Sequence, residues 1–159
     1  MIIALFIRSL KRGGAEKQSI LLTKELSKYH TVYLIILFND KALSKNLSDD
    51  LNCYFLEGNI IRKIVSLFRF LKKKQIQILF NFLPSNNILG SIMGKMAGVQ
   101  LIYNGIRGTK IKPNWVKMKL QCFLSNYIAD GILSNSHKGK ETYSKYGYKK
   151  EKITVIHNM

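Results

Sequence analysis

Two adjacent glycines, Gly13 and Gly14, separate an apolar run from a segment with helical periodicity. Glycine in a regular element costs backbone entropy, so a pair at this junction indicates a tight turn or the close approach of another group. A helix N-terminus offers unpaired N–H groups and a partial positive charge, which a phosphate could reach past glycine. The pair therefore predicts a diphosphate-binding loop or a simple turn. We expect Glu16, in the first helical turn, to favour the helix dipole or cap the loop.

A second candidate for anion binding is Arg107, between Gly105 and Gly108 in "YNGIRGTKIKPNW". Arginine forms bidentate hydrogen bonds with phosphate or carboxylate groups, although a solvated loop arginine is the alternative interpretation. Ser136 stands just before the last helical segment, where serine is a favoured N-cap.

The segment 60–74 predicts a helix with two different faces. Its apolar stripe is formed by Ile61, Ile64, Val65, Phe68 and Leu71. On the other side Arg62, Arg69 and Lys73 recur at helical spacing, as in helices that lie on membrane surfaces. This face predicts contact with a membrane or a lipid phosphate, or else an ordinary solvated surface.

Residues for acid–base or metal chemistry are scattered. Of the nine carboxylates only Asp49 and Asp50 are adjacent, and no pair is spaced for acid–base work. The three histidines show no metal-ligand spacing, and Cys53 and Cys122 read as buried free thiols. The sequence therefore predicts no metal site and no bound cofactor.

The charge of the chain is extreme for one domain. The 159 residues include 26 Lys and Arg against 9 acidic residues, a formal charge of +17. An anionic partner is expected: nucleic acid, an acidic membrane surface or a phosphorylated substrate. No apolar run reaches the roughly 18 residues of a membrane span, and residues 1–7 are too short for a signal sequence. We therefore expect a cytoplasmic protein.

Strand-like and helix-like segments alternate along the chain. The strand-like runs are residues 1–7, 31–38, 52–56, 77–82, 99–104, 128–134 and 152–157. The helical segments are residues 15–29, 60–74, 85–97, 114–127 and 137–147. Nearly continuous apolar strands alternating with helices predict an α/β fold: a doubly wound, mostly parallel, Rossmann-like sheet of about six to seven strands with helices on both faces.

Two packing expectations follow from helical spacing. In 15–29 we expect one buried stripe, formed by Ala15, Ser19, Leu22, Leu26 and Tyr29. In 85–97 and just after it, Gly90, Gly94 and Gly98 recur every four residues. Glycine lowers helix propensity, so the stripe predicts close contact with the sheet.

Three stretches together resemble one protein family: "GGAEKQ", "NNILGSIMGKMAGVQLIYNGIRG" and "ADGILSNSHKGKETYSKYGYKKEKITVIHNM". Their order and spacing resemble the N-terminal half of the family-4 glycosyltransferases, retaining enzymes of the GT-B fold, over essentially the whole chain. The resemblance implies two Rossmann-like domains facing each other across a cleft. The N-terminal domain, residues 1–159 here, would bind the acceptor, and a C-terminal domain absent from this sequence would hold the nucleotide-sugar.

The resemblance also implies roles for individual residues. Gly13 and Gly14 match the loop near the donor diphosphate, and Ser136 matches a serine after the sixth strand. Arg107 falls where many members carry a histidine near the donor sugar, and Asn158 would begin the interdomain hinge. The family's acidic pair lies in the second domain, so residues 1–159 alone are expected to be inactive.

The implied reaction is hexosyl transfer from a nucleotide-sugar co-substrate to a glycan or lipid-linked acceptor, with retention and without a metal. Such enzymes often build bacterial surface polysaccharides at the inner face of the membrane. An acidic membrane surface would then contact Arg62, Arg69 and Lys73, because basic residues near anionic lipid attract it.

Two other functions compete with this one. A nucleic-acid-binding module would explain the charge, but the sequence has no recognition motif and no aromatic platform for single strands, so nucleic acid is an unlikely partner. A standalone phosphosugar- or nucleotide-binding α/β protein is the other alternative. The reading frame after codon 159 would separate it from a transferase, which should continue into a second domain.

Overall fold

The fold is known from a computed structural model that describes residues 1–10, 13–38, 51–107 and 115–157. Its strands are β1 (Ile2–Ile7), β2 (Thr31–Ile36), β3 (Asn52–Phe55), β4 (Ile78–Phe82), β5 (Leu101–Ile106), β6 (Gly131–Ser134) and β7 (Ile153–Val155). Its helices are α1 (Gly14–Ser27), α3 (Ile60–Lys73), α4 (Pro84–Ala97), α5 (Trp115–Tyr127), α6 (His137–Lys145) and the 3₁₀ turn η1 (Lys150–Lys152). Each predicted segment is present, with its ends moved by a few residues.

All seven strands form one parallel sheet in the order β3-β2-β1-β4-β5-β6-β7. The chain winds outward from β1 in one direction and then from β4 in the other, which confirms the predicted doubly wound topology. In such sheets ligands bind beyond the carboxyl ends of the strands, where the winding direction reverses. Here that point lies between β1 and β4.

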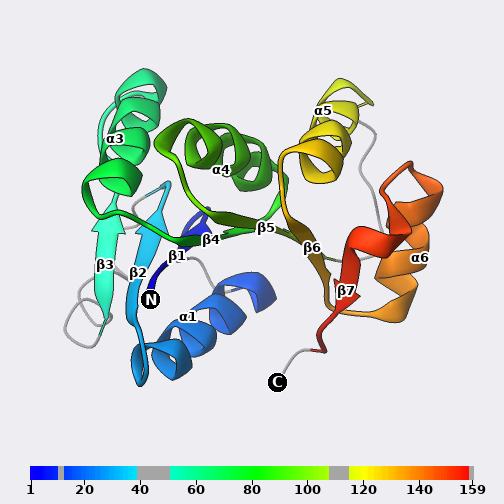
Figure 1. Cartoon of the computed structure of the whole chain (residues 1–159), viewed down its shortest axis with the longest axis horizontal. Coiled ribbons are helices and arrows are strands. Elements are labelled where there is room, and N and C mark those ends of the chain that lie inside the picture. The colour runs from blue at the N-terminus through cyan, green and yellow to red at the C-terminus, as the bar shows by residue number, and fades with distance from the viewer. Residues whose placement is uncertain (11–12, 39–50, 108–114, 158–159) are drawn as a thin grey trace.

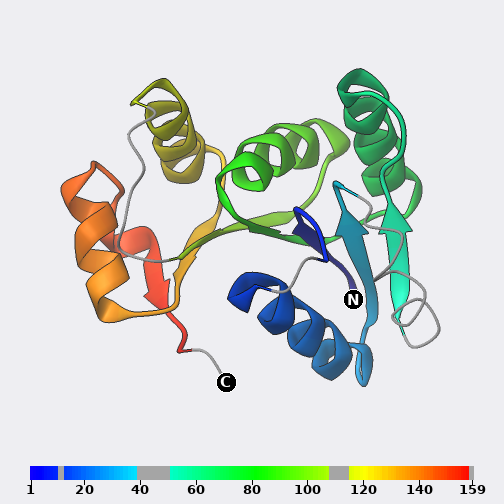
Figure 2. The ribbon, with the colours of Figure 1, turned by 180° about the vertical axis from the view of Figure 1, so that it is seen from behind.

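The helices are distributed unequally over the sheet. Figures 1 and 2 show α3, α4 and α5 on one face and α1 on the other. Tyr143 of α6 packs with Ile106 and Ile132 beside Cys122 of α5, so α6 adjoins α5 at the end of the sheet. Within the described residues, the α1 side of β5, β6 and β7 carries no helix.

Strand β1 shows how the apolar core is divided. Its residues from Ile3 to Ile7 are all buried. Ala4 and Phe6 join the core under α3 and α4, whereas Ile3, Leu5 and Ile7 join the core under α1. This two-sided burial explains the nearly continuous apolar run in the sequence.

Gly90 and Gly94 of α4 face the sheet, as predicted, whereas Gly98 lies beyond the end of the helix and a Cβ there would meet nothing within 4 Å. A Cβ at Gly90 would collide with the Asn81 side chain, and one at Gly94 would meet Ile102 and Leu79 at 3.0 Å. Gly98 caps the helix with a φ of +80°, a conformation that glycine adopts without strain.

A buried polar cluster lies between this helix, the sheet and α5. Asn81 donates to the Asn104 side chain at 2.9 Å, and these residues are register partners on β4 and β5. The Asn104 amide group donates to Ser91 of α4 at 2.9 Å and to Ser125 of α5 at 3.0 Å. The four side chains are fully buried. They therefore link two strands and two helices within the apolar core.

The predicted stripe of the first helix is only partly correct. Ser19 is buried, and Leu22 and Leu26 are half-buried. Tyr29 is 81% exposed, so that prediction is wrong. The helix ends at Ser27, and beyond its end the helical spacing no longer applies.

The stripe predicted for α3 is also partly wrong. Leu71 is buried as expected, but Ile61 and Val65 are 68% and 41% exposed. Leu67 and Phe70 are buried in their place. Because α3 covers the edge of the sheet, only one narrow side of it meets the core. In the described parts of the chain, no helix is long and apolar enough to cross a bilayer.

Candidate functional site

Two of the predicted site residues meet at the carboxyl edge of the sheet. Arg107 follows β5, and its Nη1 donates a long hydrogen bond of 3.5 Å to the carbonyl of Gly14, the first residue of α1. The guanidinium carbon lies 5.2 Å from the centre of the Phe82 ring. The fold therefore brings a cation to the N-terminus of α1 from a distant part of the sequence.

Glu16 is the acidic neighbour of this pair. A Cβ at Gly13 would collide with its carboxylate, so that carboxylate lies against the start of α1. Burial lowers the pKa of Arg107, and the charge of Glu16 opposes that shift. Gly13 and Gly14 are exposed, and nothing lies within 4 Å of a Cβ built at Gly14. An anion can therefore approach from the open side, where Glu16 would compete with it.

A groove of about 350 Å³ opens beside this pair, over the part of the sheet that α1 leaves uncovered. Its lining is formed by Gln18, Leu22, Leu26, Phe80, Phe82, Gly105, Ile106, Arg107, Leu133, Ser134, Asn135, Ile156 and His157. Apolar walls with a few polar groups at one end are typical of small-molecule sites.

Ser136 is the N-cap of α6, as predicted. Its Oγ accepts from the backbone N–H of Gly139 at 3.0 Å, and its carbonyl accepts from Ser134 Oγ at 2.9 Å. Ser136 follows the groove residues Ser134 and Asn135 directly but is not itself among the lining residues. Its hydroxyl is thus already engaged in holding the helix start.

Asn135 is a groove residue that the sequence analysis did not identify. Its Oδ1 is buried and has no hydrogen-bond partner within the described residues. A buried acceptor without a partner is costly, which makes this oxygen available to a donor on a ligand. The only signal in the sequence was its position directly after the sixth strand.

The backbone of Arg107 is also held by α6. The Tyr143 hydroxyl of α6 donates to the Arg107 carbonyl at 3.5 Å, and burial raises the pKa of Tyr143.

Leu83, between β4 and α4, has a φ of +77°. Such backbone is strained for a side chain as large as leucine, and strain of this kind concentrates at functional sites. The following Pro84 disfavours a helical Leu83 but does not predict a positive φ.

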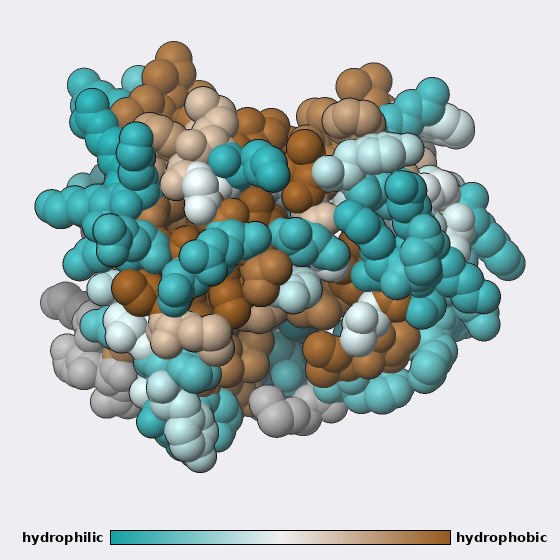
Figure 3. All heavy atoms as spheres, viewed as in Figure 1, coloured by the Kyte–Doolittle hydropathy of each residue, from teal (hydrophilic) through white to brown (hydrophobic). Residues whose placement is uncertain are grey.

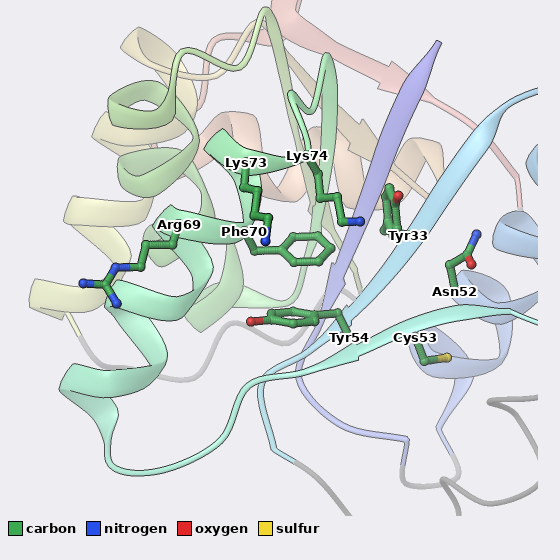
Figure 4. Close-up of a pocket in the computed structure, with 8 residues that line it drawn as sticks. All are labelled: Tyr33, Asn52, Cys53, Tyr54, Arg69, Phe70, Lys73 and Lys74. Atoms are coloured by element: carbon green, nitrogen blue, oxygen red, sulfur yellow. The ribbon is translucent and has the colours of Figure 1, made fainter.

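Arg69 and Lys73 line a different pocket, of about 450 Å³, at the β3 edge of the sheet. Figure 4 shows Lys73 extending over Phe70 and Lys74 reaching toward Tyr33, while Arg69 points outward. The Phe70 ring stacks on Tyr54 at 4.0 Å. Arg62 lies at the start of α3 and is not among the lining residues. Cations and aromatic rings thus share one surface, away from the groove.

The remaining predictions on site residues concern metals, thiols and the hinge. Among the residues described, no three His, Cys, Asp or Glu side chains are grouped to hold a metal ion. Cys53 and Cys122 form no disulfide and are half-buried, and burial raises the pKa of both thiols. Asn158 lies outside the described residues.

Neither the known protein families nor the curated proteins contain a match to this sequence. Solved structures do match. HepE of Anabaena in complex with UDP-glucose has a TM-score of 0.83 and 16% identity, over 99% of this chain and 44% of HepE. The lipopolysaccharide outer core galactosyltransferase WaaB has a TM-score of 0.75 and 19% identity, over 99% and 46%. The UDP-GlcNAc 2-epimerase of Methanocaldococcus jannaschii has a TM-score of 0.68 and 14% identity, over 99% and 46%.

These similarities define the fold: the chain has the architecture of one half of a GT-B protein. It spans less than half the length of the structures that it resembles. Glycosyltransferases and epimerases both appear among them, so the fold alone does not decide between transfer and epimerisation.

Proposed function

We propose that this chain is the acceptor-binding half of a glycosyltransferase that uses a nucleotide-sugar donor. The observation that carries the proposal is the meeting of Arg107 with the glycine start of α1 beside a groove over β4, β5 and β6. HepE, whose structure contains UDP-glucose, supports it through its fold.

Charge stabilisation is the contribution that these residues can make to transfer. A departing nucleoside diphosphate accumulates negative charge, which a fixed cation and unpaired helix N–H groups stabilise. Arg107 and the start of α1 offer both, side by side. Glu16 would move aside as the diphosphate arrives, and Asn135 and Ser136 would lie near the sugar.

We assign the nucleotide pocket to a second domain that follows Asn158 as a hinge. The solved relatives are more than twice as long as the matched region, which is consistent with this assignment. Residues 1–159 alone would then be inactive. The intact enzyme would transfer a hexose with retention to a glycan or lipid-linked acceptor in bacterial surface polysaccharide synthesis.

The pocket of Arg69 and Lys73 supports a second contact, with an anionic group. In this proposal the phosphate of a lipid-linked acceptor or of an acidic membrane surface lies against these cations, with Arg62 farther along the same helix. The protein would then work in the cytoplasm, at the inner face of the membrane.

The test is an assay of the protein translated from codon 1 through whatever follows codon 159. With labelled UDP-sugars we expect transfer to a glycan acceptor, and a loss of at least about 100-fold in kcat for Arg107→Ala, as for other preorganised charge contacts. Lys95→Ala removes an exposed cation from α4 and should leave the rate unchanged.

Three results would contradict the proposal. Release of a free, 2-epimerised UDP-sugar would favour the epimerase activity of several structural relatives. Transfer that is insensitive to Arg107→Ala would remove the assigned role of the arginine. A stop codon after Met159, with nucleotide binding but no transfer, would favour a standalone binding protein.

A further inference from the structure

Helix α5 has an apolar face that points away from the protein. The exposed fractions of Val116, Leu120, Phe123 and Tyr127 are 79%, 43%, 55% and 62%. Their spacing of four, three and four residues places them on one side of the helix. Its buried side instead contains Gln121, Ser125 and Asn126 alongside Leu124. The helix therefore packs with its polar side toward the protein, and its apolar stripe remains uncovered.

Basic residues border this stripe. The ammonium group of Lys119 lies 4.9 Å from the centre of the Trp115 ring, and that of Lys149 lies 4.5 Å from the Tyr127 ring. Trp115 is itself 63% exposed, and α5 contains no acidic residue. The apolar surface continues across a groove to Tyr146, at the end of α6.

The neighbouring helices also expose apolar residues. Figure 3 shows apolar atoms along the upper edge of the molecule, over α3 and again over α5. Ile61 of α3 and Met96 of α4 are 68% and 65% exposed. Apolar surface on this scale marks an interaction site in soluble proteins.

The charge indicates which partner covers the stripe. Two copies of a chain with a formal charge of +17 repel each other, whereas an anionic bilayer attracts both. Lysine beside an apolar stripe with tryptophan and phenylalanine is the composition of helices that lie in a membrane interface. We infer that α5 docks the protein on an anionic lipid bilayer, with Val116, Leu120, Phe123 and Tyr127 entering the boundary between headgroups and acyl chains.

This inference deepens the proposed function and rests on it for the lipid-linked acceptor. Figures 1 and 2 show α5 on the face of the sheet opposite α1, whereas the groove opens on the α1 side. Docking through α5 would therefore leave the groove uncovered by the bilayer. Arg69 and Lys73 on α3 would contribute the charge contact and α5 the apolar insertion.

Trp115 provides a direct test because it is the single tryptophan of the chain. Vesicles of mixed phosphatidylglycerol and phosphatidylcholine should shift its fluorescence emission to the blue, and brominated lipids should quench it. Pure phosphatidylcholine should give a much weaker response. After binding, raising the salt to about 1 M, where the Debye length is about 3 Å, should leave part of the blue shift, because apolar insertion is not screened.

Two variants and a control identify the surface. Leu120→Ser and Phe123→Ser should each weaken vesicle binding about tenfold, since each removes a large apolar side chain from the buried area. Tyr29→Ser removes an exposed aromatic residue beyond α1, on the other face of the sheet, and should change nothing. All three positions are exposed, so the variants should fold, which thermal unfolding verifies.

Three outcomes would overturn the inference. Vesicle binding without a change in Trp115 emission, abolished by salt, would leave only the charge contact of α3. A blue shift without lipid that grows with protein concentration would assign the stripe to a second copy. Absence of binding to any vesicle would remove both membrane contacts, while transfer to a soluble acceptor would show that the proposed activity still stands.

Discussion

At the scale of single residues, the candidate anion site already contains an anion. The Glu16 carboxylate lies against Gly13 at the start of α1, and its charge acts on Arg107. The side chain therefore occupies the position that a phosphate would need. Its charge offsets part of the charge of Arg107 when no ligand is bound, and it competes with any anion that arrives.

Glu16→Gln should therefore strengthen the binding of pyrophosphate to the chain. Removing a carboxylate at a helix N-terminus changes the local interaction by about 0.3–1 kcal/mol, which corresponds to a gain of about two- to fivefold in affinity. Isothermal titration calorimetry measures this change. Glu25→Gln, an exposed position near the other end of α1 that pairs with Lys28, serves as the matched control. Equal affinities for the two variants would show that Glu16 does not guard the site.

Two buried tyrosines predict the alkaline limit of stability. Burial raises the pKa of Tyr143 and of Tyr148 above the ordinary value of about 10. In the unfolded chain both would ionise at about pH 10, while the folded state holds them neutral. The stability present below pH 10 should therefore fall as the pH rises above it. Urea unfolding at pH 8 and pH 11 should reveal the loss.

Tyr148→Phe separates the tyrosine contribution from general alkaline effects. The Tyr148 hydroxyl is buried and has no hydrogen-bond partner in the described part of the chain. Its removal should cost less than about 1 kcal/mol at pH 8 and should reduce the loss at pH 11. Tyr127→Phe, at an exposed position, should leave the pH dependence unchanged. Equal losses in Tyr148→Phe and the unmodified chain would contradict this assignment.

At the scale of elements, α4 depends on a close approach to β4. Gly90→Ala places a Cβ against the Asn81 side chain, which is fully buried and hydrogen-bonded to Asn104. Overpacking costs about 1–3 kcal/mol, and the better helix propensity of alanine returns about 1 kcal/mol. We expect a net loss of up to about 2 kcal/mol in urea unfolding.

Gly14→Ala is the matched substitution for this test. A Cβ at Gly14 meets no atom within 4 Å, and Gly14 is likewise a helical residue with ordinary φ. This variant should be more stable than the unmodified chain by up to about 1 kcal/mol, because only the helix propensity of alanine acts there. If both alanine variants were equally stable, Asn81 would be free to move and the close approach would not matter.

The sequence predicted the elements well because strand and helix periods are local properties. Gly13, Gly14 and Arg107 could be assigned to one edge because parallel strands all end there. The hydrogen bond from Arg107 to Gly14 could not, because it depends on how α1 crosses the sheet.

Other features depended on tertiary context that spacing does not contain. Helical spacing could not predict which face of α5 is exposed, because its polar residues also recur on one side of the helix. The polar side is the buried one because Ser125 bonds to Asn104, which in turn accepts from Asn81. The prediction that Ile61 is buried failed for the same reason. Which apolar residues of α3 are buried depends on the width of the sheet beneath the helix, and the sequence spacing does not contain that width.

At the scale of the whole molecule, the charge should make stability depend on salt. A formal charge of +17 on one domain produces self-repulsion in the compact state. Ion pairs such as that of Lys28 with Glu25 are exposed and offset little of it. Raising the salt from about 0.01 M to 0.15 M shortens the Debye length from about 30 Å to 8 Å, so the melting temperature should rise. A constant or falling melting temperature would show that the positive charges are already compensated.

The asparagine and serine cluster also bears on how the chain avoids misfolding. Asn81 lies opposite Asn104 in the register of β4 and β5. Sliding one strand by a single position would turn its asparagine to the other face of the sheet, among Phe80, Leu133 and their neighbours, and away from Ser91 and Ser125. Apolar strands alone would tolerate several alignments. The buried cluster of Asn81, Ser91, Asn104 and Ser125 favours one alignment over the others. Its main consequence is therefore the register of the strands rather than a larger free energy of unfolding.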